Sequence, residues 1–418
     1  MKQDNNIPQG YKQTELGIIP KDWEVKTIAS LGNIVGGGTP STIIPAYWDG
    51  GIQWFTPAEI GASKYISKSE RTISKLGLQS SAARILPKDA ILLTTRASIG
   101  LSAILSNEAT TNQGFQSIIV NTNNCNEYAY YALKTKVSEM FTLASGSTFA
   151  EISKAKLASI KLPIPPIAEQ RAIAEALSDV DGLIAALDKK IAKKRLLKQG
   201  TMQQLLTGKK RLPGFTDKWV EITFGDYVDI YRGGSPRPIE NYITDNPNGV
   251  NWIKIGDVKP NDKYINKTEE RIIPDGVSRS RRVDVGDFIL SNSMSFGRPY
   301  ILGIDGCIHD GWLVIQNYHN NFDKDYLYYL LCSEDVMMQY MGMAAGSSVK
   351  NLNKEKVASL QLCMPTTIKE QQAIAIILSD MDKEIADLEA QRDKYRLLKS
   401  GMMQKLLTGQ IRLKTEKI

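Results

Sequence analysis

The sequence has few of the residues that build metal-dependent or covalent sites, with only 2 histidines and 4 cysteines among 418 residues. Cys125, Cys307, Cys332 and Cys363 lack the spacing of zinc ligands, which favours reduced, buried thiols and predicts no metal site. Apolar runs such as Ala90–Leu93 are far shorter than the ~20 residues of a membrane span. The polar amino terminus has no apolar signal core. We therefore expect a cytoplasmic protein.

Catalytic motifs are also missing. Adenine methylation would need an Asn/Asp-Pro-Pro-aromatic motif, and Leu162–Ile167 (LPIPPI) does not provide one. No glycine-rich fingerprint of a dinucleotide site and no phosphate-binding loop is present. His309 stands beside Asp310, but no serine or cysteine nucleophile accompanies the pair. The sequence therefore predicts no catalytic residue and no cofactor in this chain, and we expect that it is not itself an enzyme.

What the sequence does contain is a long internal repeat. Ile167–Leu212 and Ile368–Leu413 align without a gap at an offset of 201 residues, and 27 of 46 positions are identical. Composition alone does not produce a match of this length, so the chain carries a duplication. The separation is far longer than the periods of solenoid repeats. We infer an architecture of two similar halves.

Both repeated segments have the heptad spacing of a coiled-coil helix of about 40 residues, or about 60 Å. Proline precedes each segment, and Gly208 and Gly409 follow the LLT run near its end, as expected for helix ends. Gly200 and Gly401 lie inside the pattern, where we expect a kink or a break. Arg392 interrupts the second pattern, which Tyr395 and Leu398 resume. The residues predicted to pair the helices are Ile173, Leu177, Val180, Ile184, Leu187 and Ile191, and Ile374, Leu378, Met381, Ile385 and Leu388.

The blocks that precede the two helices are more distantly related. Gly36–Pro40 (GGGTP) aligns with Gly233–Pro236 (GGSP), and Asn112–Phe115 (NQGF) aligns with His309–Trp312 (HDGW). Short β-rich runs are expected at Ile52–Thr56, Ile91–Thr95, Ser117–Val120, Val250–Ile255, Asp287–Ser291 and Trp312–Gln316, with helices at Asn126–Leu143 and Lys324–Met341. We predict a mixed α/β (α+β) fold, in which two similar globular domains are joined by two long antiparallel helices with pseudo-two-fold symmetry. The alternative is that each helix packs only on its own domain.

The predicted boundaries place a first domain at residues 1–166 and its helical spacer at 167–208. A second domain follows at 209–366, its spacer at 367–410 and a tail at 411–418. The net charge of +7 is uneven, because residues 213–367 carry 16 basic and 20 acidic side chains. A polyanionic partner therefore requires a local basic face rather than a basic total.

Five stretches resemble the specificity subunits of type I restriction–modification systems. They are Pro165–Asp181 (PPIAEQRAIAEALSDVD), Leu196–Phe215 (LLKQGTMQQLLTGKKRLPGF), Thr367–Asp382 (TIKEQQAIAIILSDMD), Leu397–Leu413 (LLKSGMMQKLLTGQIRL) and Gly36–Ile60. The resemblance covers nearly the whole chain in the family's order. It implies two target recognition domains, each of which binds one half of a bipartite site in double-stranded DNA. It also implies paired helices that set the spacer and dock two methyltransferase (M) subunits, which use S-adenosylmethionine. Restriction/translocase (R) subunits with ATP and Mg²⁺ are the further partners, and no membrane is involved.

Within this frame, the polar and basic residues of the predicted loops are candidate DNA contacts. Glycine-rich turns expose N–H groups that can hold a phosphate, and arginine and glutamine can pair with guanine and adenine. The candidates in the first domain are Gly37, Thr39, Ser41, Lys64, Lys75, Arg96, Ser98, Asn112 and Gln113. Those in the second are Arg232, Ser235, Arg237, Arg279, Arg281, Arg282, Ser293 and Arg298. Each could instead be an ordinary turn or a solvated residue, and the whole chain could be a coiled-coil adaptor that binds proteins rather than DNA.

Overall fold

The computed structural model describes residues 7–144, 150–259, 262–292, 297–344 and 352–413. The chain forms two compact units. Unit 1 contains Met1–Leu187 and Gln391–Ile418, and unit 2 contains Asp188–Ala390. Each unit therefore combines one globular domain, part of the helix that follows that domain and part of the other long helix.

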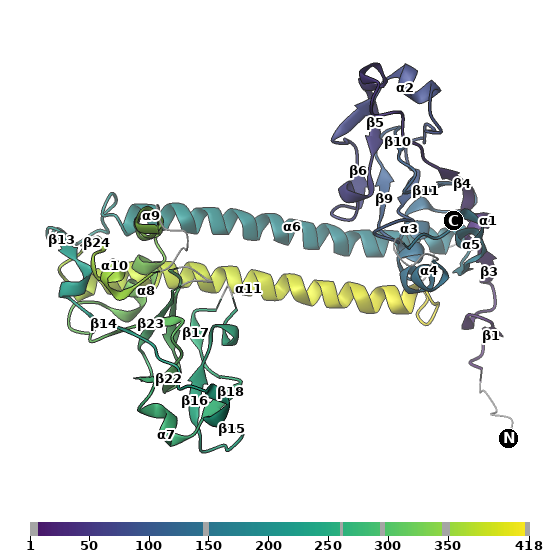
Figure 1. Ribbon diagram of the computed structural model, residues 1–418. Coiled ribbons are helices and arrows are strands. Elements are labelled where there is room, and N and C mark those ends of the chain that lie inside the picture. The colour runs from purple at the N-terminus through teal and green to yellow at the C-terminus, as the bar shows by residue number, and fades with distance from the viewer. Residues whose placement is uncertain (1–6, 145–149, 260–261, 293–296, 345–351, 414–418) are drawn as a thin grey trace, which may run out of the picture. The chain divides into compact units, whose positions relative to one another are not determined.

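The first domain is built on a five-stranded sheet of order β4-β11-β8-β9-β6 (Figure 1). These strands are β4 (Gly32–Gly36), β11 (Gln116–Val120), β8 (Ile91–Leu93), β9 (Ser102–Leu105) and β6 (Tyr65–Ile66). A second sheet has the order β10 (Thr110–Thr111), β5 (Trp48–Phe55) and β7 (Arg71–Ile73). Two further pairs are β3 (Glu24–Thr27) with β12 (Lys161–Ile164), and the hairpin β1 (Tyr11–Thr14) with β2 (Gly17–Pro20).

The second domain repeats this topology. Its five-stranded sheet has the equivalent order β14 (Asp229–Arg232), β23 (Trp312–Gln316), β20 (Phe288–Ser291), β21 (Pro299–Leu302) and β17 (Tyr264–Ile265). The other sheet has the order β15 (Ile243–Thr244), β18 (Glu270–Ile272), β16 (Val250–Ile253), β22 (Gly306–Ile308) and β19 (Arg281–Val283). The pair β13 (Val220–Thr223) and β24 (Gln361–Met364) corresponds to β3 and β12. The weak sequence alignment of the two blocks thus reflects one fold, and the predicted β-rich runs all fall on strands.

Two helices of 39 residues each, α6 (Ile167–Leu205) and α11 (Ile368–Leu406), follow the domains. In unit 1, Asp181 pairs with Lys399 at 2.5 Å while Glu169 pairs with Arg412 at 2.7 Å, so the two chain directions are opposed. In unit 2, the equivalent pairs are Lys198 with Asp382 at 2.5 Å and Arg211 with Glu370 at 2.7 Å. The helices are therefore antiparallel, and the alternative of two helices that each pack only on their own domain is wrong.

Neither Gly200 nor Gly401 breaks its helix, because both helices continue through these positions. A glycine costs a helix only about 1 kcal/mol relative to alanine, and packing against a partner helix offsets this cost. Gly208 and Gly409 do have the left-handed conformation expected after a helix end, with φ of 68° and 71°. Leu398 does not resume the buried seam, since it is 50% exposed.

The shorter helices differ from the prediction in one respect. The expected helix at Asn126–Leu143 is divided into α3 (Asn126–Lys134) and α4 (Val137–Leu143), and the equivalent one into α8 (Lys324–Leu331) and α9 (Glu334–Ala344). The Ser333 hydroxyl accepts from the Val336 N–H and so caps the start of α9, which explains that break. The remaining helical turns are α1 (Ile28–Leu31), α2 (Lys75–Gln79), α5 (Lys154–Ser159), α7 (Pro274–Val277) and α10 (Lys354–Ala358).

The four cysteines are free thiols as expected, but only Cys307 is buried.

The hydrophobic cores continue from the domains into the long helices. In unit 1, Trp23 of the domain shares one buried cluster with Ile173 and Leu177 of α6 and with Leu406 and Leu407 at the end of α11. Unit 2 contains the equivalent cluster, in which Ile374 and Leu378 of α11 join Leu205 and Leu206 at the end of α6. Each domain is therefore fixed to both helices by buried apolar side chains.

Candidate nucleic-acid interface

In unit 1, the glycine-rich loop that leaves β4 crosses the turn that leads into β11. The Gly38 N–H donates to the carbonyl of Thr111 at 2.9 Å. At Gly37 a Cβ atom would lie 2.0 Å from the carbonyl oxygen of Asn112, so only glycine allows this approach. The Thr39 hydroxyl, two residues on, donates to the side-chain oxygen of Gln113. The structure thus brings together four of the predicted residues from two separate motifs.

Unit 2 has the same crossing, between the loop after β14 and the turn before β23. The Gly234 N–H donates to the carbonyl of Ile308 at 3.1 Å. A Cβ atom at Gly233 would lie 2.1 Å from the carbonyl oxygen of His309. The Ser235 hydroxyl donates to a carboxylate oxygen of Asp310 at 2.9 Å. Thr39 with Gln113 and Ser235 with Asp310 are therefore the same pair in two copies of one loop crossing.

Asp310 gathers polar groups from three parts of the second domain. A terminal guanidinium nitrogen of Arg237 lies 3.2 Å from the carboxylate, and Arg232 donates to the backbone carbonyl at 3.2 Å. The Asn292 amide also donates to this carbonyl, at 3.0 Å. Burial raises the pKa of Asp310, but the bond from Ser235 and the charges nearby outweigh this effect and lower the pKa below its ordinary 3.8. The carboxylate is an anion that holds Arg237 at the loop, and the backbone carbonyl of the same residue holds Arg232. The sequence indicates Asp310 only as a neighbour of His309 and does not reveal this role.

Two more predicted arginines lie close to this loop crossing. The Arg281 guanidinium lies over the ring of Tyr231, 4.8 Å from its centroid, and a Cβ atom at Gly234 would lie 3.2 Å from the carbonyl oxygen of Arg279. Although residues 213–367 are acidic overall, the crossing in unit 2 is thus bordered by Arg232, Arg237, Arg279 and Arg281. Binding of a polyanion requires a local concentration of basic side chains of this kind.

The other predicted residues are scattered. Arg282 lies near Asp284 and Asp305, and Arg298 lines a cavity with Lys198 and Lys263 beside α11. In unit 1, Arg96 and Ser98 form a tight turn after β8, and Arg96 is paired with Glu151 at 2.7 Å. Lys75 is exposed at the start of α2, and the carbonyl of Ser41 accepts from Trp48. Ser293 lies outside the described residues.

Comparison with known proteins places the chain in a family. The model of the type I restriction modification DNA specificity domain matches twice, at residues 20–194 and 216–395. The chain belongs to this family. It is a type I restriction–modification specificity subunit, as the sequence motifs predicted.

Two relatives from Methanocaldococcus jannaschii illustrate the range of similarity. The type I restriction enzyme MjaIX specificity subunit is 44% identical over 178 residues, which are 42% of this chain and 41% of that relative. The putative type I restriction enzyme MjaX specificity subunit is 26% identical over 97% of this chain and 98% of its own length.

Solved structures share the fold. A type I restriction–modification S subunit from M. genitalium aligns with a TM-score of 0.56 at 16% identity, covering 97% of this chain and 98% of that one. A chain from a study of complex assembly and conformational transition of the type I R-M system aligns with a TM-score of 0.62 at 16% identity, covering 94% and 99%. Among the residues that the structure describes, no helix combines the length and the apolar character that a bilayer crossing requires.

In this specificity subunit, Lys64 lies where the first domain meets the long helices. Its ammonium group lies 3.1 Å from Glu127 of α3 and donates to Ser178 of α6 at 2.6 Å, and its side chain is only 12% exposed. Tyr131 donates to Asp181, which also pairs with Lys399. Lys263 and Asp325, 2.7 Å apart, occupy the equivalent place in unit 2. Because Lys64 is enclosed by these partners, the structure favours a structural role over the predicted phosphate contact.

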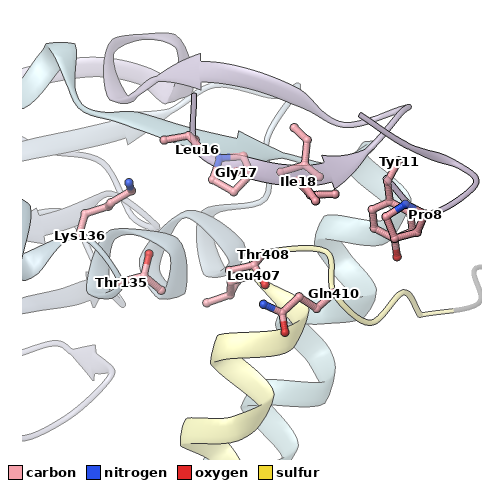
Figure 2. A pocket seen from close by; sticks show the side chains of 12 residues that line it. Pro8, Tyr11, Leu16, Gly17, Ile18, Thr135, Lys136, Leu407, Thr408 and Gln410 are labelled. Atoms are coloured by element: carbon pink, nitrogen blue, oxygen red, sulfur yellow. The ribbon is translucent and has the colours of Figure 1, made fainter. Parts of the chain in front are cut away.

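The first and last described segments of the subunit meet in unit 1. The hairpin β1–β2 packs on the end of α11 and bounds a cavity of about 800 Å³ (Figure 2). Tyr11 and Ile18 contribute from the hairpin and Leu407 from the end of the helix, and the Tyr11 hydroxyl donates to the carbonyl of Gly409 at 3.0 Å. Arg412 pairs with both Asp22 and Glu169, and Trp23 also donates to Glu169. The first domain is therefore completed by residues about 390 positions later in the chain.

Proposed function

We propose that each recognition domain binds one half of a bipartite site in double-stranded DNA through its loop crossing. The observation that carries this proposal is the repetition of the crossing in both units, with glycine at the point of closest approach and polar side chains at the surface. Arg232, Arg237, Arg279 and Arg281 supply the positive charge in unit 2. Phosphate contacts position a protein on DNA, whereas side chains that reach base edges specify the sequence.

We further propose that the paired helices set the length of the spacer between the two half-sites and dock two methyltransferase subunits. Supporting features are the exposed leucines at equivalent positions of the two helices, Leu196 (68% exposed) and Leu397 (76% exposed). Large apolar side chains exposed on both copies of a duplicated helix suit contact with a protein partner. The chain itself is non-catalytic. S-adenosylmethionine belongs to the methyltransferase subunits, and ATP and Mg²⁺ belong to the restriction/translocase subunits.

Co-expression of the chain with its neighbouring methyltransferase subunit, followed by mapping of methylated adenines, tests the central proposal. We expect two short half-sites separated by a fixed gap. Binding of the complex to its site should also weaken steeply with salt, by about 10³- to 10⁵-fold between 50 and 200 mM if it makes 6–10 phosphate contacts. A stable complex that methylates no DNA, with salt-insensitive association, would instead identify a protein-binding adaptor.

The ruler function has its own test. Seven residues inserted after Leu187 of α6 and seven after Leu388 of α11 preserve the heptad phase and add about 10.5 Å at 1.5 Å per residue. At about 3.4 Å per base pair this should lengthen the spacer by about three base pairs with both half-sites unchanged. The matched control is the insertion in α6 alone, which should disrupt the pairing of the helices. An unchanged spacer in the double insertion contradicts the ruler.

A further inference from the structure

The two loop crossings share their geometry but differ in one chemical respect. In both, a hydroxyl from the glycine-rich loop donates to the side chain of the residue that follows Asn112 or His309. In unit 1 the acceptor is the neutral amide of Gln113, and in unit 2 it is the carboxylate of Asp310. A position that keeps its place in the fold and changes its hydrogen-bonding groups is suited to distinguishing ligands.

The exposure of these groups argues against a purely structural role. Thr39 and Gln113 are exposed, and the Arg237 side chain is 78% exposed. An exposed hydrogen bond between neutral groups contributes little to stability, because water replaces either partner. In the structure this bond orients the amide group of Gln113, just as the Asp310 carboxylate orients the guanidinium of Arg237. Restricting a side chain before binding reduces the entropy lost when the ligand is bound.

The groups that remain available define the ligand. The Gln113 oxygen accepts from Thr39 and keeps a second lone pair, and within the described part of the chain its amide N–H groups have no acceptor. An amide that presents one donor and one acceptor matches the N7 and N6 edge of adenine. One terminal nitrogen of Arg237 contacts Asp310, which leaves the remaining donors of the guanidinium exposed. A guanidinium held in this way matches O6 and N7 of guanine.

We propose that each of the two loop crossings recognises one base of its own half-site. Gln113, oriented by Thr39, contacts an adenine in the half bound by unit 1. Arg237, with Asp310 as its positioning residue, contacts a guanine in the half bound by unit 2. The inference rests on the proposed function, because it assigns bases to residues of the same DNA interface.

Three single variants test the assignment, in the complex with the methyltransferase subunit: Gln113→Glu, Arg237→Ala and Asp310→Asn. Gln113→Glu preserves the shape of the side chain but removes the donor for N7. DNA binding and methylation are measured for each variant on sites that carry each of the four bases in turn at every position of both half-sites. We expect each variant to lose about 5- to 150-fold of the preference for one base in its own half-site. The half-site of the other unit is the internal control and should stay unchanged.

The possible results distinguish failure of this inference from failure of the proposed function. If the wild-type complex recognises a bipartite site but the variants keep every base preference, the inference is overturned and the proposed function stands. An equal loss on all four bases indicates a phosphate contact and also overturns it. If the wild-type complex forms but recognises no DNA sequence, the proposed function itself fails. A structural role for Asp310 would lower complex formation in general rather than relax one base position.

Discussion

The substitution Arg412→Gln should open the first domain although the residue is near the carboxyl end of the chain. Arg412 forms two hydrogen bonds with Glu169 at 2.7 Å and two with Asp22 at 2.7 and 2.8 Å. Glu169 is only 3% exposed, and Asp22 is 50% exposed. Removal of one partner of a buried ion pair costs about 3–5 kcal/mol. Because Arg412 is 38% exposed and Trp23 still donates to Glu169, we expect about 2–3 kcal/mol here.

Hydrogen exchange measured by mass spectrometry can locate this effect. At 1.4 kcal/mol for each factor of ten, peptides that cover β3 and β12 should exchange about 30- to 140-fold faster in the variant. Peptides from unit 2 should not change. Asp22→Asn is the matched control, since loss of the exposed pair alone should cost no more than about 1 kcal/mol. If Arg412→Gln has no larger effect than Asp22→Asn, or if the two units respond equally, the pair with Glu169 does not hold the first domain together.

Three other perturbations have defined outcomes. Gly37→Ala should lower the free energy of unfolding by about 1–3 kcal/mol and weaken DNA binding, because the new Cβ would lie 2.0 Å from a carbonyl oxygen. The control is Gly36→Ala, whose Cβ would meet only the Gln116 side chain at 3.6 Å. This control should have little effect on the denaturation midpoint. Burial raises the pKa of Glu127, but hydrogen bonds from Tyr65 and Lys64 lower it below the ordinary 4.5. The ionised form of Glu127 therefore stabilises the fold above about pH 4.5, and this stabilisation is lost as the pH falls below that value. The urea midpoints of wild type and Glu127→Gln should converge on acidification. A difference in midpoint that does not change with pH would contradict the assignment. The double variant Leu196→Lys and Leu397→Lys should change the free energy of unfolding by less than about 0.5 kcal/mol. It should reduce co-purification of the methyltransferase subunit at least tenfold. Retained association would show that the docking surface lies elsewhere.

The features that the sequence predicted well are those repeated over many residues. The heptad pattern extends over whole helices. A single exception such as Gly200 therefore does not change the type or the length of the predicted element. The loop crossing was predictable as two aligned motifs, because Gly37 and Gly233 precede a hydroxyl residue in both copies. What alignment could not provide was the contact between the loop and the turn, since the two motifs are separated by more than 70 residues. The domain boundaries, the assignment of DNA contacts and the assignment of helix-pairing residues remain predictions.

The features that differ from the prediction depend on contacts that the local sequence pattern does not reveal. Lys64 looked like a surface cation from its neighbours in sequence, but Glu127 and Ser178, 63 and 114 positions later, enclose it. The break between α8 and α9 depends on one serine cap, which the apolar periodicity of the segment concealed. Leu398 fits the heptad register, yet a register does not reveal whether the opposite helix covers that position. Only for Lys64 do contacts with residues distant in the sequence override the local pattern.

The division of unit 1 between the two ends of the chain has a consequence for synthesis on the ribosome. Its final residues emerge about 200 codons after α6, which corresponds to roughly 10–40 s at 5–20 residues per second. During this interval Glu169 and Asp181 lack their cationic partners Arg412 and Lys399, and the apolar side chains that will meet Leu406 and Leu407 are uncovered. Helix α6 alone carries acidic residues such as Asp181 near its start and basic residues such as Lys198 near its end. Two nascent chains can therefore pair their α6 helices in antiparallel fashion with each other. We therefore expect chaperone access to the nascent chain to increase the yield of correctly assembled protein.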